Sequence, residues 1–208
     1  MGNDNKVKNI ILTVLVIGLV SMTIAYAALT QTLYIRDNQV TITTDWSVHF
    51  ANKAGATDAV ATSTGTGTHT ATVNAQPTLT ATEISGLRAT FRKPGDKVTY
   101  EFDIVNDGAI DATLSSATYA TPTCTSSDST VTSGTLSTFC NNHINYSIVY
   151  TGTNSAPAAD DDLLATSPNN IRHCTLTVEL DPNTEVTDIP VGDITVSNIA
   201  ATFIYVQK

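Results

Sequence analysis

The sequence predicts an all-β protein, with a single jelly-roll or β-sandwich domain after an N-terminal hydrophobic helix. Beyond residue 30, apolar and polar residues alternate in short runs, which is the pattern of half-buried strands. Glycine, proline, asparagine and aspartate separate these runs. Threonine, which favours extended backbone, occurs 37 times, whereas charged residues make up only 14% of the chain. A sandwich is therefore favoured over alternating strands and helices.

The first residues have the layout of an export signal. Residues 1–9 are polar and contain two lysines, residues 10–29 are mostly apolar, and Ala25, Ala27 and Ala28 supply small residues for cleavage after Ala27. The alternative is an uncleaved membrane anchor, because residues 10–29 are long enough to span a bilayer. A type IV pilin stem is less favoured, since its usual glycine and glutamate are absent. Signal and anchor both place the remaining chain outside the cell or at its surface.

The chain divides into three parts. Residues 1–29 form the signal or transmembrane anchor, residues 30–38 a donor or linker strand, and residues 39–208 the sandwich. Three stretches are predicted to be loops, at 52–69, 121–137 and 151–171, with one helical turn near 160–165. Ten strands are expected, at Thr30–Ile35, Gln39–Phe50, Thr70–Ala75, Thr78–Ile84, Arg88–Phe91, Lys97–Val105, Ala109–Tyr119, His143–Tyr150, Cys174–Leu180 and Asp193–Val206.

Two turns flank the strand Lys97–Val105. Lys93-Pro94-Gly95-Asp96 has proline second and glycine third, which predicts a type II turn. Asn106-Asp107-Gly108 is predicted to close the following hairpin. Between the turns the residues alternate strictly, which predicts an apolar inner face and an outer face carrying Thr99, Glu101 and Asp103.

The charge of the chain excludes one class of partner. The formal net charge is −9, and removal of residues 1–27 would make it slightly more negative. Nucleic acid is therefore not expected as a partner, because phosphate binding needs clustered basic residues. The nearest approach to such a cluster, Arg88, Arg92, Lys93 and Lys97, is better explained as a solvated hairpin tip.

The three cysteines predict one disulfide in an exported protein. Cys124 and Cys140 flank a short serine- and threonine-rich loop, so we favour this pair and leave Cys174 free in a buried strand. A bond between Cys124 and Cys174 is the alternative. A metal site built from Cys174, His173 and His143 lacks the spacing of structural zinc sites and is disfavoured.

No catalytic motif is recognisable, so we predict no enzyme, no cofactor and no metal site. The four histidines do not form H-E-x-x-H, and the chain has no G-x-S-x-G sequence. The acidic run Asp160–Asp162 is better explained as a solvated loop than as a calcium site. A secreted hydrolase that uses two carboxylates is the least favoured of the functions weighed.

The segment from Phe91 to Gly108 resembles the central motif of the TasA/camelysin family of bacterial surface fibre proteins. The matching residues are Lys93, Pro94, Gly95, Asp96, Asn106 and Gly108. The resemblance implies a jelly-roll subunit of a biofilm-matrix fibre, a homopolymer in which the N-terminal strand of one copy completes the sheet of the next. The donor strand would then be formed by Thr30, Gln31, Thr32, Leu33, Tyr34 and Ile35. The alternative function is a membrane-tethered, monomeric surface adhesin or binding module.

Overall fold

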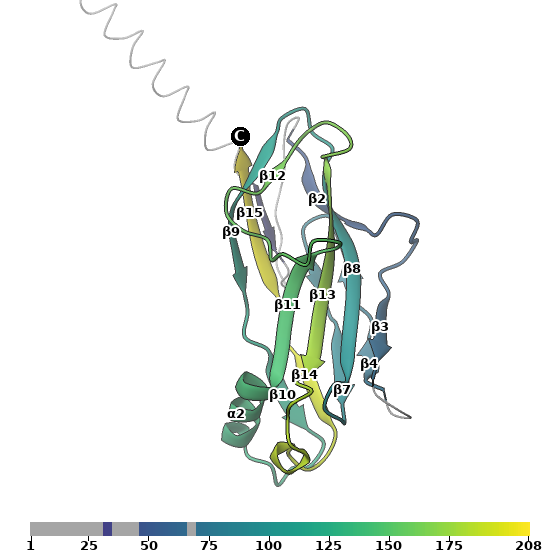
Figure 1. Cartoon of the computed structure of the whole chain (residues 1–208), viewed down its shortest axis with the longest axis vertical. Coiled ribbons are helices and arrows are strands. Elements are labelled where there is room, and N and C mark those ends of the chain that lie inside the picture. Colours follow the sequence, from purple (N-terminus) through teal and green to yellow (C-terminus); the bar gives the residue numbers. More distant parts are fainter. Residues whose placement is uncertain (1–30, 35–45, 66–69) are drawn as a thin grey trace, which may run out of the picture.

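The computed structural model in Figure 1 describes residues 31–34, 46–65 and 70–208, and for residues 31–34 it describes the backbone alone. The predicted N-terminal helix, its cleavage site and most of the predicted strand Gln39–Phe50 lie outside these ranges. The elements are β1 (Gln31–Tyr34), β2 (Val48–Asn52), β3 (Ala61–Thr64), β4 (Thr72–Ala75), β5 (Thr78–Leu79), β6 (Ile84–Ser85), β7 (Arg88–Phe91), β8 (Lys97–Asn106), β9 (Ala112–Tyr119), β10 (Thr123–Ser126), α2 (Ser133–His143), β11 (Ile144–Tyr150), β12 (Asp162–Leu163), β13 (Ile171–Leu180), the 3₁₀ turn η1 (Val186–Asp188), β14 (Ile194–Ser197) and β15 (Ala201–Gln207).

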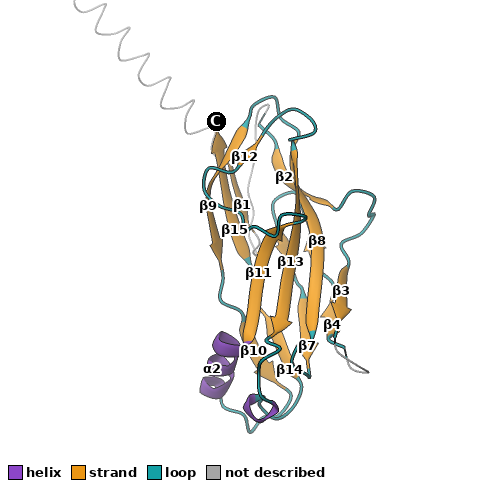
Figure 2. Ribbon diagram, viewed as in Figure 1, coloured by secondary structure: helices purple, strands orange, loops and turns teal. Residues whose placement is uncertain are grey.

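The strands form two layers. The front sheet has the order β11-β13-β8-β2, with β3 pairing beside β2 on the same side of β8. The back layer holds an upper back sheet, β1-β15-β9-β12, and a lower back sheet, β10-β14-β7-β4. Figure 2 shows the front sheet lying over both of them. The strand pairs of these three sheets are antiparallel, which confirms the predicted all-β sandwich.

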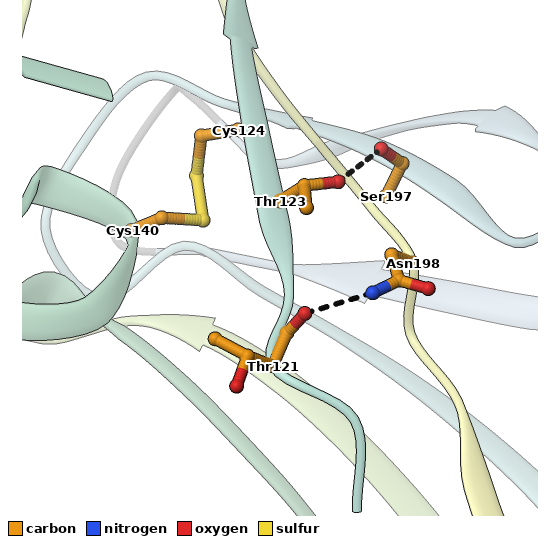
Figure 3. The surroundings of a disulfide bond; sticks show 6 residues. All are labelled: Thr121, Thr123, Cys124, Cys140, Ser197 and Asn198. Carbon is orange, nitrogen blue, oxygen red and sulfur yellow. Dashed lines mark hydrogen bonds between the residues drawn. A yellow bond between two sulfur atoms is a disulfide. The ribbon is translucent and has the colours of Figure 1, made fainter. Parts of the chain in front are cut away.

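Two long strand paths, β9 to β10 and β14 to β15, run through both back sheets and pair with each other. β15 pairs with β9, and β14 pairs with β10, in one common register. Between these pairs lie residues 120–122 on one path and 198–200 on the other. There the side-chain amide of Asn198 donates a hydrogen bond to the carbonyl of Thr121, at 2.9 Å (Figure 3). The predicted strand Asp193–Val206 is therefore broken into two.

The core fills the space between the layers. Phe50 of β2 packs edge-on against Phe102 of β8 and Phe203 of β15, with ring centroids 5.6 and 6.3 Å apart. Aromatic rings favour this edge-to-face arrangement. The predicted inner face of β8 is confirmed, because Val98, Tyr100, Phe102 and Ile104 are all buried.

Both turns that flank β8 differ from the prediction in one respect. Neither closes a hairpin: the turn Lys93–Asp96 leads from the lower back sheet into the front sheet, and Asn106–Gly108 leads from the front sheet to β9. Strand β8 instead pairs along most of its length with β13, about 70 residues later in the chain. A tight turn shortens the connection between two strands but does not force them into one sheet.

The predicted loops contain elements that the sequence pattern did not reveal. Strand β3 lies in the stretch 52–69, β10 lies within 121–137, and α2 begins in that stretch and ends beyond it. Helix α2 begins after Thr132, whose hydroxyl accepts a hydrogen bond from the backbone of Thr135, a standard N-cap. The helical turn expected near 160–165 is wrong, since this stretch contains β12. None of the helices in the described ranges is long and apolar enough to cross a membrane.

Candidate functional site: the β1–β15 margin

Strand β15 forms the wall of the candidate site. Its residues alternate, so that Ala201, Phe203 and Tyr205 are buried while Thr202 and Ile204 are half-buried on the outer side. On one flank β15 pairs with β9. On the other flank it offers its backbone groups to one further strand, which is β1.

Strand β1 is a short margin of the upper back sheet. It runs antiparallel to β15, with Gln31 opposite Tyr205 and Tyr34 opposite Thr202. Leu33 lies opposite the buried Phe203, although the structure gives only backbone positions for β1. No second strand of the described chain flanks β1. Of the six predicted donor residues, Gln31, Thr32, Leu33 and Tyr34 therefore lie on β15 of their own copy, while Thr30 and Ile35 fall outside the described residues.

The slot beside β15 has a lower boundary. The upper and lower back sheets meet just before β15, and a cavity of about 180 Å³ lies there over the paired ends of β9 and β15, lined by residues 118–120 and 200–202. Below this junction the same strand path continues as β14, whose flank is occupied by β7. The free flank of β15 therefore holds a single short strand, the four residues of β1.

The motif turn Lys93–Asp96 connects the two layers through buried hydrogen bonds. Gly95 has a φ of +85°, the value that the third position of a type II turn requires. The Asp96 carboxylate is fully buried and accepts hydrogen bonds from the backbone N–H groups of Arg92 and Lys93, at 3.1 and 3.2 Å. Asp96 also pairs through its backbone with Leu180 at the end of β13. The turn therefore ties both layers together at the lower end of the sandwich.

Asn106 fastens the upper end in a similar way. Its side-chain amide donates to the carbonyls of Ile110 and Leu163, at 2.9 and 3.1 Å, and its oxygen accepts from the N–H of Gly108. The residue is completely buried. The motif asparagine and glycine thus hold the β8–β9 connection against β12.

The disulfide joins Cys124 of β10 to Cys140 of α2, with Cα atoms 5.7 Å apart (Figure 3). This confirms the predicted pair, and the alternative bond to Cys174 is wrong, because Cys174 is free and buried. Burial, with a smaller contribution from the charge of Asp103, raises the pKa of the Cys174 thiol well above its usual range. The thiol is therefore a protonated core group, and the disulfide pins α2 over the edge of the lower back sheet.

A second cavity lies against the front sheet. It has a volume of about 260 Å³, and its lining includes Lys53, Glu101, Asp103, Thr151 and His173. The prediction placed Asp103 on an exposed face, yet its side chain is only 4% exposed, because the loop after β2 covers it. Its carboxylate accepts hydrogen bonds from the Nδ1 of His173, at 2.7 Å, and from the backbone of Ala54, at 3.1 Å. Sequence reasoning missed this pair, because its members lie 70 residues apart and meet only through strand register.

Three further polar residues, His143, Asp161 and Asp162, form hydrogen bonds within the fold. His143 contacts the Thr184 hydroxyl, so it lies apart from the pair of His173 and Asp103. In the described ranges no three histidine, cysteine or carboxylate side chains gather into a metal-binding group. Asp161 accepts hydrogen bonds from the Tyr150 hydroxyl and from a backbone N–H of its own loop. Asp162 pairs with Lys208, and this hydrogen bond lowers the pKa of its carboxyl.

Tyrosines are concentrated between the layers. Burial raises the pKa of Tyr100 to about 12, with a smaller contribution from Asp103. Burial also raises the pKa values of Tyr119, Tyr146, Tyr150 and Tyr205. The raised pKa values keep these side chains protonated at neutral pH.

The fold and the site define an antiparallel β-sandwich protein with a short strand, β1, at one sheet margin. Comparison of the chain with protein-family models, with curated proteins and with solved structures found no match.

Proposed function

We propose that the chain is the structural subunit of an extracellular filament, in which the segment Thr30–Ile35 of one copy takes the place of β1 in the next. The observation that carries the proposal is the position of β1. It is four residues long, it pairs with β15 alone among the described strands, and Leu33 lies in register with the buried Phe203.

The exchange is plausible on energetic grounds. A strand donated by a neighbour makes the same backbone hydrogen bonds with β15 as the strand of the same chain, so the two arrangements differ little in enthalpy. Vacating the slot without replacement would expose unpaired backbone groups of β15. Each copy that gives its strand away therefore requires a strand from another copy, and this requirement propagates a chain.

The donated strand can be trapped by cross-linking. In the variant Thr32→Cys/Ile204→Cys, the two new cysteines occupy opposite positions in the β1–β15 register. Oxidation of assembled protein should then give a ladder of covalent oligomers on a non-reducing gel. The matched control is Thr62→Cys/Thr99→Cys, whose hydroxyls lie 3.0 Å apart on β3 and β8 and which should cross-link only within one copy.

Three results would count against the proposal. Filaments seen by electron microscopy whose Thr32→Cys/Ile204→Cys subunits cross-link only within single copies would exclude strand donation. Wild-type protein that stays monomeric at high concentration would exclude the filament itself. Deletion of residues 30–35 should abolish filaments, and filaments of undiminished length after this deletion would also contradict the proposal.

A membrane-tethered binding module is the second candidate. The observation that favours it is the 260 Å³ cavity on the front sheet, where Asp103 is held by His173. N-terminal sequencing of the exported protein separates the two functions. A mature start at Ala28 suits a filament subunit, whereas retention of Met1 suits a tether through residues 10–29.

A further inference from the structure

Strand β11 is an open margin of the front sheet. It pairs with β13 over its full length and with no other strand of the described chain. Figure 1 shows it as the outermost strand of this sheet. Its sequence from Ile144 to Tyr150 contains no charged residue, no proline and no glycine. Natural proteins usually protect such edges, because an uncharged, unpaired strand is a template for pairing with another chain.

Neighbouring margins carry the protection that β11 lacks. On the lower back sheet, α2 is pinned against the edge strand β10 by the disulfide. On the upper back sheet, β12 covers the start of β9. On β4, the pairing register shifts between Val73 and Ala75, which interrupts that edge. The edge of β11 has none of these three forms of protection.

The hydrogen-bonding groups that β11 presents outward can be identified from its two ends. At the upper end, the N–H of Tyr150 donates to Ser155 and its carbonyl accepts from Asn154, so both groups point away from β13. At the lower end, the N–H of Ile144 donates to Cys140 on the same side. Backbone groups alternate in direction along an antiparallel strand. Tyr146 and Ile148 therefore present their N–H and C=O groups outward, and no partner for them exists in the described ranges.

The geometry points to a second copy of this chain as the occupant, with the two β11 strands pairing antiparallel about a twofold axis through Ser147. In this register Tyr146 of each copy lies opposite Ile148 of the other, and the outward N–H and C=O groups of all four residues are satisfied. On the outer face, Ser147 lies opposite Ser147 of the other copy, and Asn145 lies opposite the half-buried Val149. A twofold interface needs such self-complementarity.

Charge supports a self-association at this edge. The chain has a net charge of −9, so copies repel one another over most of their surface. The seven residues of β11 carry none of that charge.

A pair of aromatic rings lies beside the edge of β11. Tyr119 is 41% exposed, and its ring lies edge-on to that of Tyr146, with centroids 6.0 Å apart. The Tyr146 hydroxyl is buried without a hydrogen-bond partner in the described chain. A second copy would cover this aromatic seam.

The expected pairing is short, so an isolated pair of copies should form a weak dimer. Many copies aligned along two filaments would act together, because the first contact raises the effective concentration for the next. In a filament, β11 would therefore join neighbouring filaments side by side. The inference does not depend on strand donation through β1, since β11 lies on the other layer of the sandwich.

A cysteine on the twofold axis tests the register. In the variant Ser147→Cys the two sulfurs would meet at a non-hydrogen-bonded pair, whose Cα separation of about 4.5 Å suits a disulfide. Mild oxidation should convert this full-length variant to a covalent dimer. The control is Thr62→Cys, an exposed residue on the opposite margin of the front sheet, which should remain monomeric. Absence of a Ser147→Cys dimer, or equal dimerisation of both variants, would overturn the inference.

A charge variant tests the association without cross-linking. Ser147→Lys places two like charges directly opposite each other, so sedimentation should show at least tenfold weaker dimerisation. Thr62→Lys adds the same charge on the far margin and should dimerise like the wild type. If Ser147→Lys dimerises like Thr62→Lys, the inference fails. Filament length measured on the same variants reports strand donation separately, so the two proposals can fail independently.

Discussion

The lower and upper halves of the back layer share one strand path, but they hold their neighbouring strands differently. In the lower half, β7 lies between β14 and β4, and the turn held by the Asp96 carboxylate follows it directly. In the upper half, β1 is a margin strand of four residues that pairs with β15 alone among the described strands. The same kind of position is thus filled by a strand inside the sheet below and by a margin strand above. Strand exchange requires this difference, because a subunit must stay folded while one of its strands leaves.

Hydrogen exchange should show the largest contrast. Amides of β7 are expected to exchange only on global unfolding, since β7 has partners on both sides. Amides of β1 should exchange by local opening, with an opening free energy several kcal/mol below that of β7. Measurement of single-residue exchange on monomeric protein checks this expectation. A common opening free energy for both strands would remove the distinction between the two halves.

Loss of the disulfide should have the next largest effect. The bond joins residues 16 apart in the sequence, and closing a loop of this size contributes about 3 kcal/mol to the free energy of unfolding. We expect the variant Cys124→Ser/Cys140→Ser to lose about that amount in urea unfolding. The control Cys174→Ala removes a buried sulfur but no cross-link, so it should lose about 1 kcal/mol. Equal losses would show that the cross-link itself contributes little.

Substitution of Asp96 in the motif turn should have the third largest effect. Asp96→Ala leaves the N–H groups of Arg92 and Lys93 without an acceptor, so the free energy of unfolding should fall by about 2 kcal/mol. Asp96→Asn keeps an acceptor oxygen and should lose about half as much. Urea unfolding of the two variants decides the point. If alanine and asparagine cost the same, the backbone bonds of Asp96 are not what stabilises the lower half.

Alkaline pH should give the smallest effect of the four within the usual working range. The folded pKa of Tyr100 is about 12, above the value near 10 in an unfolded chain. Between these values the unfolded chain loses protons that the folded chain keeps, so stability should fall as pH rises above about 10. The pKa values of the tyrosines in β9, β11 and β15 are raised as well. Urea unfolding with tyrosinate absorbance as a second probe tests this, and constant stability up to about pH 11 would contradict it.

The local sequence pattern was sufficient to predict several features of the fold. Strand β7 has the predicted limits, and β8 and β11 differ from prediction by only one residue, because strict alternation and flanking turn residues mark their ends. The disulfide was predictable from the spacing of Cys124 and Cys140 in a loop-like stretch. Helix α2 was missed because only Leu136, Phe139 and Cys140 are buried, too few to produce a helical period in a serine- and threonine-rich segment.

The candidate site was predictable only in part. The sequence alone marked Thr30–Ile35 as an apolar strand next to an export segment, and alternation of residues requires no knowledge of the partner strand. Its place against β15, the pairing of His173 with Asp103 and the open edge of β11 depended on which strands meet. Those pairings join residues far apart in the chain. They are selected by the packing of two layers around a common core, and no local stretch of sequence contains that information.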